Sequence, residues 1–162
     1  MNKKHQFNLE LYPKFGSLGV LGQTIKSHGG SGTSNLAYGL VAYEFEKIDS
    51  SYRSSISVQS SLVIHPINEF GSKKQKDKYL PDLINGKKIG CFGLTESEAG
   101  SDPSSMKTTY RKTKDGYILN GSKNWITNAP IADILIIWAL EENKDHKSIE
   151  GFILEKNFNG LK

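Results

Sequence analysis

A short segment rich in glycine and hydroxylated residues is the first stretch whose residue types could do chemistry. The sequence GCFGLTESEAGSD, residues 90–102, begins as an apolar strand and ends as a turn. Glycines in a strand let another body approach the backbone closely, and Thr95 then offers a hydroxyl and an amide. The amides and hydroxyls of the EAGSD turn could converge on an anion, so a planar heterocycle carrying phosphates would suit this layout. A surface turn leading out of a core strand explains the same residues, and neither Walker nor Rossmann glycine spacing is present.

A second segment, SKNWIT at residues 122–127, brings a tryptophan and a threonine to what we expect to be the start of a β segment. A tryptophan beside hydroxyls can cover a flat ring while a hydroxyl reaches the edge of that ring. Ordinary core packing is the alternative for Trp125. The preceding Asn120-Gly121 pair predicts a two-residue β-hairpin turn between two β-prone stretches.

Charged and sulfur-containing residues are further candidates for binding or catalytic roles. Arg53, beside a predicted buried helix, could bind a carboxylate through two parallel hydrogen bonds, or could form an interhelical salt bridge. The acids Glu96, Glu98 and Asp102 could form an acid/base cluster, but carboxylates in a turn are usually structural or solvated. Cys91 lies in an apolar strand without cationic neighbours, which predicts an unreactive thiol. No metal site is predicted.

The elements that must position these residues change character near Lys88. Before that point the spacing predicts three helices in succession. The segment SNLAYGLVAYEFEKID is amphipathic with Ser34 as its N-cap, and SVQSSLVIHPINEF is a largely buried helix bent or interrupted by Pro66. The third helix starts with a Ser72 to Gln75 capping box and stops at Gly86.

After Lys88 the periodicity shortens and turn signals multiply, which predicts strands. The expected strands lie in KIGCFGLT, SMKTTYRKT, GYILN, ADILIIWALE and EGFILEK. The sequence therefore predicts an α+β fold. A partial helical domain at residues 1–87 would pack on an antiparallel, β-barrel-like domain at residues 88–162.

Composition limits the classes of function. The 162 residues carry a net charge of +4, but the 21 basic residues are interleaved with 17 acids, unlike the clustered charge of a nucleic-acid surface. A single cysteine excludes an internal disulfide framework and suggests a reducing compartment. No run has transmembrane length, and the opening residues lack the apolar core of a signal peptide, so the cytosol is the default location.

Two quoted segments now carry a family resemblance. CFGLTESEAGSDPSSM together with LNGSKNWITNAPIAD resembles the paired flavin-binding signatures of the acyl-CoA dehydrogenases. Residues 18–96 resemble glutaryl-CoA dehydrogenases more than the straight-chain enzymes, and DSSYRSSISVQSSL is the most discriminating part. The resemblance covers nearly the whole chain from Gly16 onward. It implies FAD as cofactor, glutaryl-CoA as acyl-CoA substrate, an electron-transfer flavoprotein as acceptor, and a homotetramer or a complementing polypeptide in the complete assembly.

The resemblance also implies roles for individual residues. Thr95 would meet the pyrimidine edge of the flavin, Thr127 would lie near its hydride-accepting atom, and Ser101 would lie near the pyrophosphate and the CoA portion of the substrate. The implied cofactor-binding residues are Phe92, Leu94, Thr95, Ser101, Trp125, Ile126 and Thr127. Arg53 would face the distal carboxylate of glutaryl-CoA with Ser54 assisting, and Glu46 matches a family acid near that arginine.

The sequence departs from the family at two places. Ser97 stands where the family usually has proline. The C-terminal helical domain, which carries the catalytic glutamate in the family, is not found, so no residue here is expected to be the base. The chain could be one piece of a split or truncated glutaryl-CoA dehydrogenase of lysine and tryptophan degradation, a non-catalytic FAD or acyl-CoA binding remnant, or a gene fragment with exposed edge strands.

A dehydrogenase for another short or branched acyl-CoA is the rival within the enzyme class. The resemblance would place a bacterial protein in the cytoplasm and a eukaryotic one in the mitochondrial matrix, although no transit peptide is evident.

Overall fold

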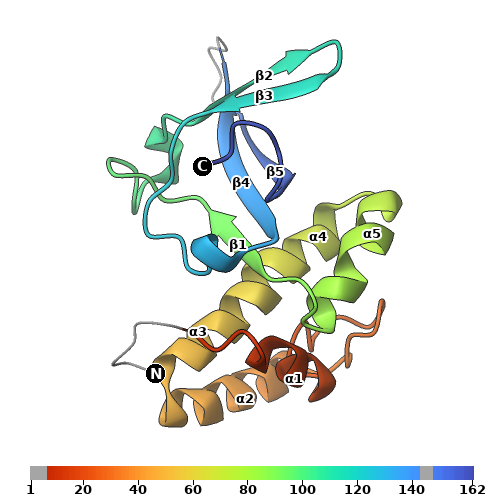
Figure 1. Cartoon of the computed structure of the whole chain (residues 1–162). Coiled ribbons are helices and arrows are strands. Elements are labelled where there is room, and N and C mark those ends of the chain that lie inside the picture. Colours follow the sequence, from red (N-terminus) through yellow and green to blue (C-terminus); the bar gives the residue numbers. More distant parts are fainter. Residues whose placement is uncertain (1–6, 143–147) are drawn as a thin grey trace. The chain divides into compact units, whose positions relative to one another are not determined.

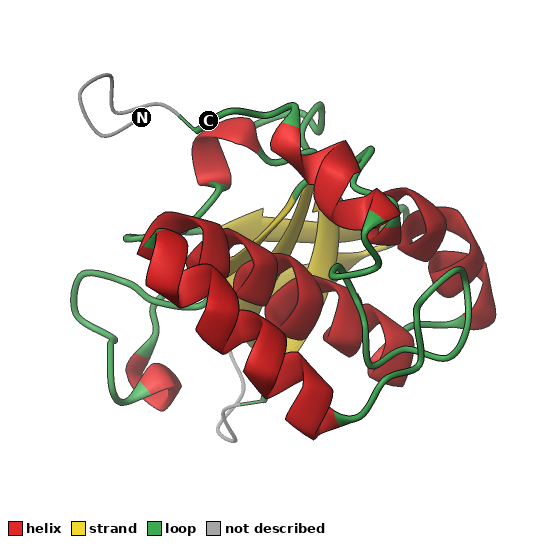
Figure 2. Cartoon of the chain, turned by 90° about the horizontal axis from the view of Figure 1, so that it is seen from below, coloured by secondary structure: helices red, strands yellow, loops and turns green. Residues whose placement is uncertain are grey.

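The chain divides into two units, residues 1–89 and 90–162, which Figure 1 colours along the sequence. The computed structural model describes residues 7–142 and 148–162. The long helices belong to the first unit and the strands to the second; Figure 2 colours helices and strands differently. The predicted α+β class is confirmed, and each unit is described by itself below.

The first unit consists of helices. Their bounds are α1 (Leu11–Ser17), α2 (Asn35–Ile48), α3 (Ser50–Ser57), the π-helical segment η2 (Val58–Ile64), α4 (His65–Phe70) and α5 (Lys73–Ile84). The Ser34 side chain accepts a hydrogen bond from the Ala37 amide at the start of α2, as predicted. The capping box of α5 is also confirmed, since Ser72 and Gln75 each accept from the other's amide.

The helical path through Pro66 is continuous, although the sequence predicted a bend or interruption. Residues 50–70 stay helical because η2 lies directly before the proline (Figure 1). A proline ring clashes with the carbonyl four residues earlier in a regular α-helix, and the wider π-helical turn relieves that clash. Gln59 in this segment is fully buried and donates to the carbonyls of Leu83 and Lys88, at 2.9 Å each.

Two glycines bring α1 close to the end of α5. Gly86 has φ +72°, and a Cβ there would overlap the Tyr12 carbonyl. A Cβ at Gly16 would overlap the backbone of Asn85 in the same way. The predicted stop at Gly86 is therefore correct, and the glycine also permits a backbone approach between helices that the sequence did not predict.

The second unit contains a sheet of five strands within its described residues. They are β1 (Gly90–Gly93), β2 (Thr109–Thr113), β3 (Gly116–Asn120), β4 (Ile134–Glu141) and β5 (Ile149–Glu155). Strand β4 is central, and Figure 1 shows it beside β5. It pairs with β5 over residues 134–140 in antiparallel register, and with β1 over residues 134–137 in parallel. Pairing on both sides suits the apolar sequence ILIIWALE.

The expected antiparallel, barrel-like arrangement needs correction. The β1–β4 and β2–β4 pairs are parallel, and the described strands form an open sheet. The reason is topological: residues 94–133 connect β1 to β4 over a distance long enough for a crossover, and the β2–β3 hairpin lies within that connection.

The predicted hairpin turn at Asn120-Gly121 is also wrong. The β2–β3 turn lies at residues 114–115, and Thr113 pairs with Gly116. Gly121 instead lies against Thr108, where a Cβ would be 2.6 Å from the Thr108 Cα. Residues 122–127, expected to begin a strand, form a loop because the chain must pass beside Thr108 before it reaches β4.

Replacing Gly86 by alanine should destabilise the first unit. The substitution forces a Cβ into a positive-φ position that is already occupied by the Tyr12 carbonyl. We expect the free energy of unfolding to fall by about 2–4 kcal/mol, measured by denaturant titration of the helical circular dichroism signal. Gly39→Ala is the control, because nothing lies within 4 Å of a Cβ in that helical position. It should stabilise by about 0.5–1 kcal/mol. Equal changes in unfolding free energy for Gly86→Ala and Gly39→Ala would contradict the close backbone approach at Gly86.

Candidate functional site

Two loops of the second unit bring most of the predicted cofactor-binding residues together. The first loop comprises residues 94–108 after β1, and the second loop comprises residues 121–133 before β4. The Asn124 amide donates to the Thr95 carbonyl at 2.9 Å. The Lys123 ammonium donates to the Leu94 carbonyl at 3.0 Å. Thr95 and the segment that starts at Trp125 are therefore held beside each other.

The second loop is anchored on both sides of Trp125–Thr127. Lys123 and Asn124 hold it on one side. On the other side, Asn128 Nδ2 donates to the Gly90 carbonyl at 3.2 Å. The residues between these anchors, Trp125, Ile126 and Thr127, are left partly or fully exposed.

Trp125 is 92% exposed and has a φ of +60°. Core packing, the alternative explanation of this tryptophan, is therefore wrong. A bulky side chain at positive φ costs about 1–3 kcal/mol and is found where the surrounding structure fixes the backbone. A large apolar ring held out from the surface on a fixed loop is suited to covering a flat ligand.

The remaining cofactor-binding candidates occupy three different environments. Phe92 is half-buried on β1, with its ring 5.9 Å from that of Trp138. Leu94 packs against a small apolar cluster that includes Ala99. Ser101 is exposed on the first loop. Their side chains are thus distributed along β1 and the loop that follows it.

Gly93 does provide a close approach, but the body that approaches is the chain itself. A Cβ at Gly93 would lie 2.5 Å from Ile137 Cδ1 and 3.3 Å from Lys123 Cγ. The glycine therefore makes room first for the Ile137 side chain and then for the stem of Lys123. The close approach expected at Gly93 is therefore made by side chains of the same chain.

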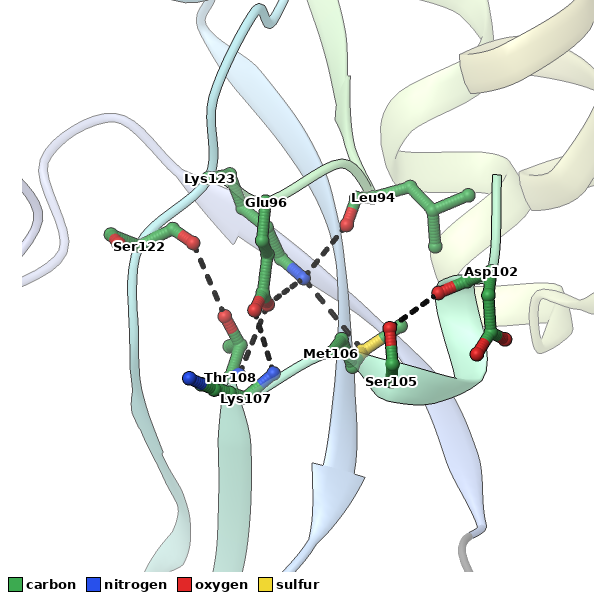
Figure 3. A network of polar contacts seen from close by, with 9 residues as sticks. All are labelled: Leu94, Glu96, Asp102, Ser105, Met106, Lys107, Thr108, Ser122 and Lys123. Carbon is green, nitrogen blue, oxygen red and sulfur yellow. Dashed lines mark hydrogen bonds and ion pairs between the residues drawn. The ribbon is translucent and has the colours of Figure 1, made fainter. Parts of the chain in front are cut away.

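A buried ion pair joins the two loops (Figure 3). The ammonium of Lys123 lies 2.7 Å from Glu96 Oε1, and both side chains are 8% exposed. The same carboxylate accepts from the Thr108 amide at 3.0 Å and from the Lys107 amide at 2.6 Å. The sequence predicts that the carboxylates of this turn are structural or solvated, and the first alternative holds for Glu96; it does not identify Lys123. The available signal was a lysine next to a predicted ligand-contacting tryptophan.

The hydrogen bonds around Glu96 decide its protonation state. Burial alone raises the pKa of this carboxyl, but donation from Lys123, Thr108 and Lys107 outweighs burial and lowers the pKa to about 2. Glu96 is therefore an anion at neutral pH and serves as an acceptor rather than a proton donor.

The other two acids of the turn are exposed and serve the loop itself. Glu98 forms an ion pair with Lys107 on the surface. Asp102 caps the short helical turn η3 (Pro103–Ser105) by accepting from the Ser104 amide at 3.0 Å. Glu96, Glu98 and Asp102 thus each make contacts that hold the loop, as is usual for structural carboxylates in a turn.

Of the three substrate-binding candidates, Arg53 and Ser54 lie on α3 of the first unit, and Ser101 lies on the first loop of the second unit. Arg53 Nε donates to Glu46 Oε2 at 2.6 Å, and Ser50 donates to Glu46 Oε1 at the same distance. These bonds, from Ser50 first and Arg53 second, lower the pKa of Glu46. The expected proximity of Glu46 to Arg53 is confirmed. Arg53 remains 39% exposed and has further N–H donors for a ligand, and Ser54 is half-buried beside it.

Cys91 is fully buried on β1, and burial raises the pKa of its thiol to about 11. The predicted unreactive thiol is thus supported by its environment. Over residues 7–142 and 148–162, no group of His, Cys, Asp and Glu side chains is arranged to hold a metal ion. In the same ranges, no helix has both the length and the apolar character needed to cross a membrane.

Comparison with known proteins gives matches along nearly the whole chain. Residues 1–87 match the family model described as acyl-CoA dehydrogenase, N-terminal domain, and residues 91–162 match acyl-CoA dehydrogenase, middle domain. An acyl-CoA dehydrogenase of Bacillus subtilis (strain 168) is 39% identical over 163 residues, which is 99% of this chain and 43% of the relative.

Two solved structures illustrate the similarity in fold. A glutaryl-CoA dehydrogenase of Mycobacterium smegmatis in complex with FADH2 has a TM-score of 0.90 and 43% identity, covering 95% of this chain and 39% of that one. Butyryl-CoA dehydrogenase of Megasphaera elsdenii has a TM-score of 0.88 and 40% identity, covering 98% and 43% respectively. The chain thus spans less than half the length of these relatives.

The low pKa of Glu96 makes stability depend on pH. The folded pKa of about 2 lies below the ordinary value of 4.5, so the stabilisation is complete above about pH 4.5 and is lost as pH falls toward 2. A shift of this size corresponds to about 3 kcal/mol. We expect urea titrations across this range to show a loss of that order in the wild type and a clearly smaller loss in Glu96→Gln. Glu98→Gln, which removes an exposed partner, should retain the acid loss. An unchanged acid profile in Glu96→Gln would refute the role of Glu96.

Proposed function

Because this chain belongs to the acyl-CoA dehydrogenase family, we propose that its second unit binds FAD as part of a flavin-dependent acyl-CoA dehydrogenase. The observation that carries the proposal is the exposed Trp125–Thr127 segment, anchored on both sides next to Thr95. The residues present fit the cofactor, because a strained, exposed tryptophan and partly accessible threonines supply a ring cover and hydrogen-bond donors.

When bound, FAD supplies the hydride acceptor for oxidation of an acyl thioester. In this proposal the chain's own residues orient the cofactor and stabilise the charge that develops on it. The amide and hydroxyl of Thr95 would donate toward the edge of the flavin where negative charge develops. Trp125 and Ile126 would exclude water from the ring, and Thr127 would offer a hydroxyl near them. Ser101 would donate to a phosphate of the cofactor or of CoA.

We propose that the catalytic base lies outside the described residues. Each acid of the first loop is engaged within the chain: Glu96 by Lys123, Glu98 by Lys107, and Asp102 by the η3 turn. The relatives are more than twice as long as this chain. A glutamate in the remaining part of a complete enzyme, or in a complementing polypeptide, would remove the α-proton.

Glutaryl-CoA is the substrate that we propose, because Arg53 offers a guanidinium to a distal carboxylate. Its pairing with Glu46 uses Nε, so a ligand carboxylate would be gripped by the other donors, with Ser54 assisting. After oxidation, the glutaconyl thioester would lose carbon dioxide to give crotonyl-CoA, and the electrons would pass to an electron-transfer flavoprotein.

A short-chain acyl-CoA without a distal carboxylate is the second candidate. The Arg53–Glu46 pair favours it in one respect, because Glu46 already compensates the cation when no ligand carboxylate is present. An uncharged acyl chain would then leave no buried, unpaired charge.

FAD binding is tested by the absorbance spectrum of the purified chain after incubation with excess FAD and desalting. We expect retained flavin bands in the wild type. Trp125→Ala should weaken binding by about tenfold, since base-like aromatic stacking contributes on the order of 1–3 kcal/mol. The substitution should leave stability unchanged because the side chain is exposed. Phe158→Ala, at another exposed aromatic residue of the same unit, is the control. No flavin on a folded wild-type chain would reject the proposal.

Substrate preference is tested by calorimetric binding of glutaryl-CoA and butyryl-CoA. We expect the wild type to bind glutaryl-CoA about tenfold more tightly, the factor typical of one hydrogen bond to a charged group, and Arg53→Ala to abolish that preference. Lys47→Ala, which removes an exposed cation paired with Glu44, should leave the preference intact. An equal loss for both ligands in Arg53→Ala would favour the short-chain candidate.

A further inference from the structure

We propose that the buried Glu96–Lys123 pair is a positioning element that fixes Thr95 relative to Trp125 and so sets the affinity of the second unit for FAD. The inference rests on the proposed function but assigns a role to residues outside the predicted cofactor contacts. Neither side chain is proposed to touch the cofactor.

Lys123 and Asn124 bind three consecutive residues of the first loop. The Lys123 ammonium donates to the Leu94 carbonyl at 3.0 Å and to Glu96 Oε1 at 2.7 Å, on either side of Thr95. The Asn124 amide donates to the carbonyl of Thr95 itself at 2.9 Å. Trp125 follows directly in the chain. The backbone of Thr95 is therefore held at three points against the start of the Trp125–Thr127 segment.

The other side of the pair is fixed to the sheet. The Glu96 carboxylate accepts from the amides of Lys107 and Thr108. The Thr108 carbonyl in turn accepts from the Leu140 amide of β4 at 2.9 Å. A continuous chain of hydrogen bonds thus leads from the central strand through Glu96 and Lys123 to both loops, as Figure 3 shows around the carboxylate.

The groups of the pair are saturated, which makes the arrangement rigid. An ammonium has three N–H donors. In the described residues, those of Lys123 have three acceptors: Leu94 O, Glu96 Oε1 and, at 3.7 Å, Met106 Sδ. Burial makes each lost bond costly, because a charge left without its partner is not rescued by water. Apolar side chains of equal volume would fill the space, but their packing is not directional and would not fix this distance.

The exposed Glu98–Lys107 pair provides a matched comparison. It joins two points of the first loop, whereas the buried pair joins the first loop to the second; Glu98 lies two residues from Glu96, and the amide of Lys107 donates to the Glu96 carboxylate. Both of its side chains are mostly exposed, so water can replace the contact. If any ion pair of the first loop affected FAD affinity, removing either pair would weaken binding. If affinity instead depends on the position of Thr95 relative to Trp125, only removal of the buried pair will weaken it.

The experiment compares Glu96→Gln, Lys123→Met and the double variant with wild type and with Glu98→Gln. FAD affinity is measured by flavin fluorescence titration. Loop position is measured, without flavin, by hydrogen exchange of the Asn124 amide, with the β4–β5 amides as the reference for the fold. We expect at least about tenfold weaker FAD binding and about tenfold faster Asn124 exchange in each single variant, with the β4–β5 amides still protected. Glu98→Gln should match wild type in both readouts.

The double variant covers the case in which a single variant unfolds. Removing both charges leaves no unpaired buried ion, so the unit should fold, but the hydrogen bonds from the Lys123 ammonium to Leu94 and residue 96 are still lost. Weaker FAD binding and faster Asn124 exchange in this folded variant support positioning. Wild-type affinity and exchange in it would overturn the inference. A wild-type chain that binds no FAD refutes the proposed function, and with it the link to affinity, whereas FAD binding insensitive to these variants refutes the positioning role alone.

Discussion

A carboxylate removed from water must have its acceptor sites filled, and this constraint organises the second unit. Glu96 meets it with an ammonium and two backbone amides, contributed by segments far apart in sequence. Each partner fixes a different piece of chain: the start of β2 through Thr108, and the second loop through Lys123. Gly93 and Gly121 lie beside these contacts: a Cβ at Gly93 would overlap Ile137 and crowd the stem of Lys123, and a Cβ at Gly121 would overlap Thr108. The surface that carries Trp125 follows from these contacts.

Local elements could be predicted from the sequence because their causes are local. The Ser34 cap, the Ser72–Gln75 capping box and the stop at Gly86 each depend on side chains and backbone within one turn. The sheet topology could not be predicted in this way. Parallel pairing of β1 with β4 depends on how the intervening forty or so residues cross over, and alternation within a strand carries no information on its partner. The hairpin turn predicted at Asn120-Gly121 was wrong for a related reason. Gly121 is needed because it packs closely against Thr108, which is distant in sequence, and not because a turn lies there.

The candidate site was predictable to a similar degree. Residues that would meet a ligand have distinctive types, such as a tryptophan among hydroxyls, and the resemblance to a family placed them on this chain. Lys123 is marked only by its position two residues before Trp125, and its residue type points away from burial, because a lysine in a polar loop usually lies in solvent. Its burial became visible through the space left by Gly93 and the carboxylate of Glu96. Residues that hold a site together are harder to find than those that form its surface, since their partners are set by tertiary structure.

The two ion pairs near predicted binding residues differ in how deeply they are buried, and burial decides what each pair can do. Glu96 and Lys123 are buried and saturated, so exchanging a partner would strand a charge in a dry environment. Glu46 and Arg53 are partly exposed, and water can solvate either group while a partner changes. The guanidinium also has donors beyond the one that binds Glu46. An exposed, unsaturated pair can accept a ligand carboxylate at low cost, whereas a buried, saturated pair can preserve a distance. Burial, rather than residue type, therefore separates a recognition role from a positioning role in this chain.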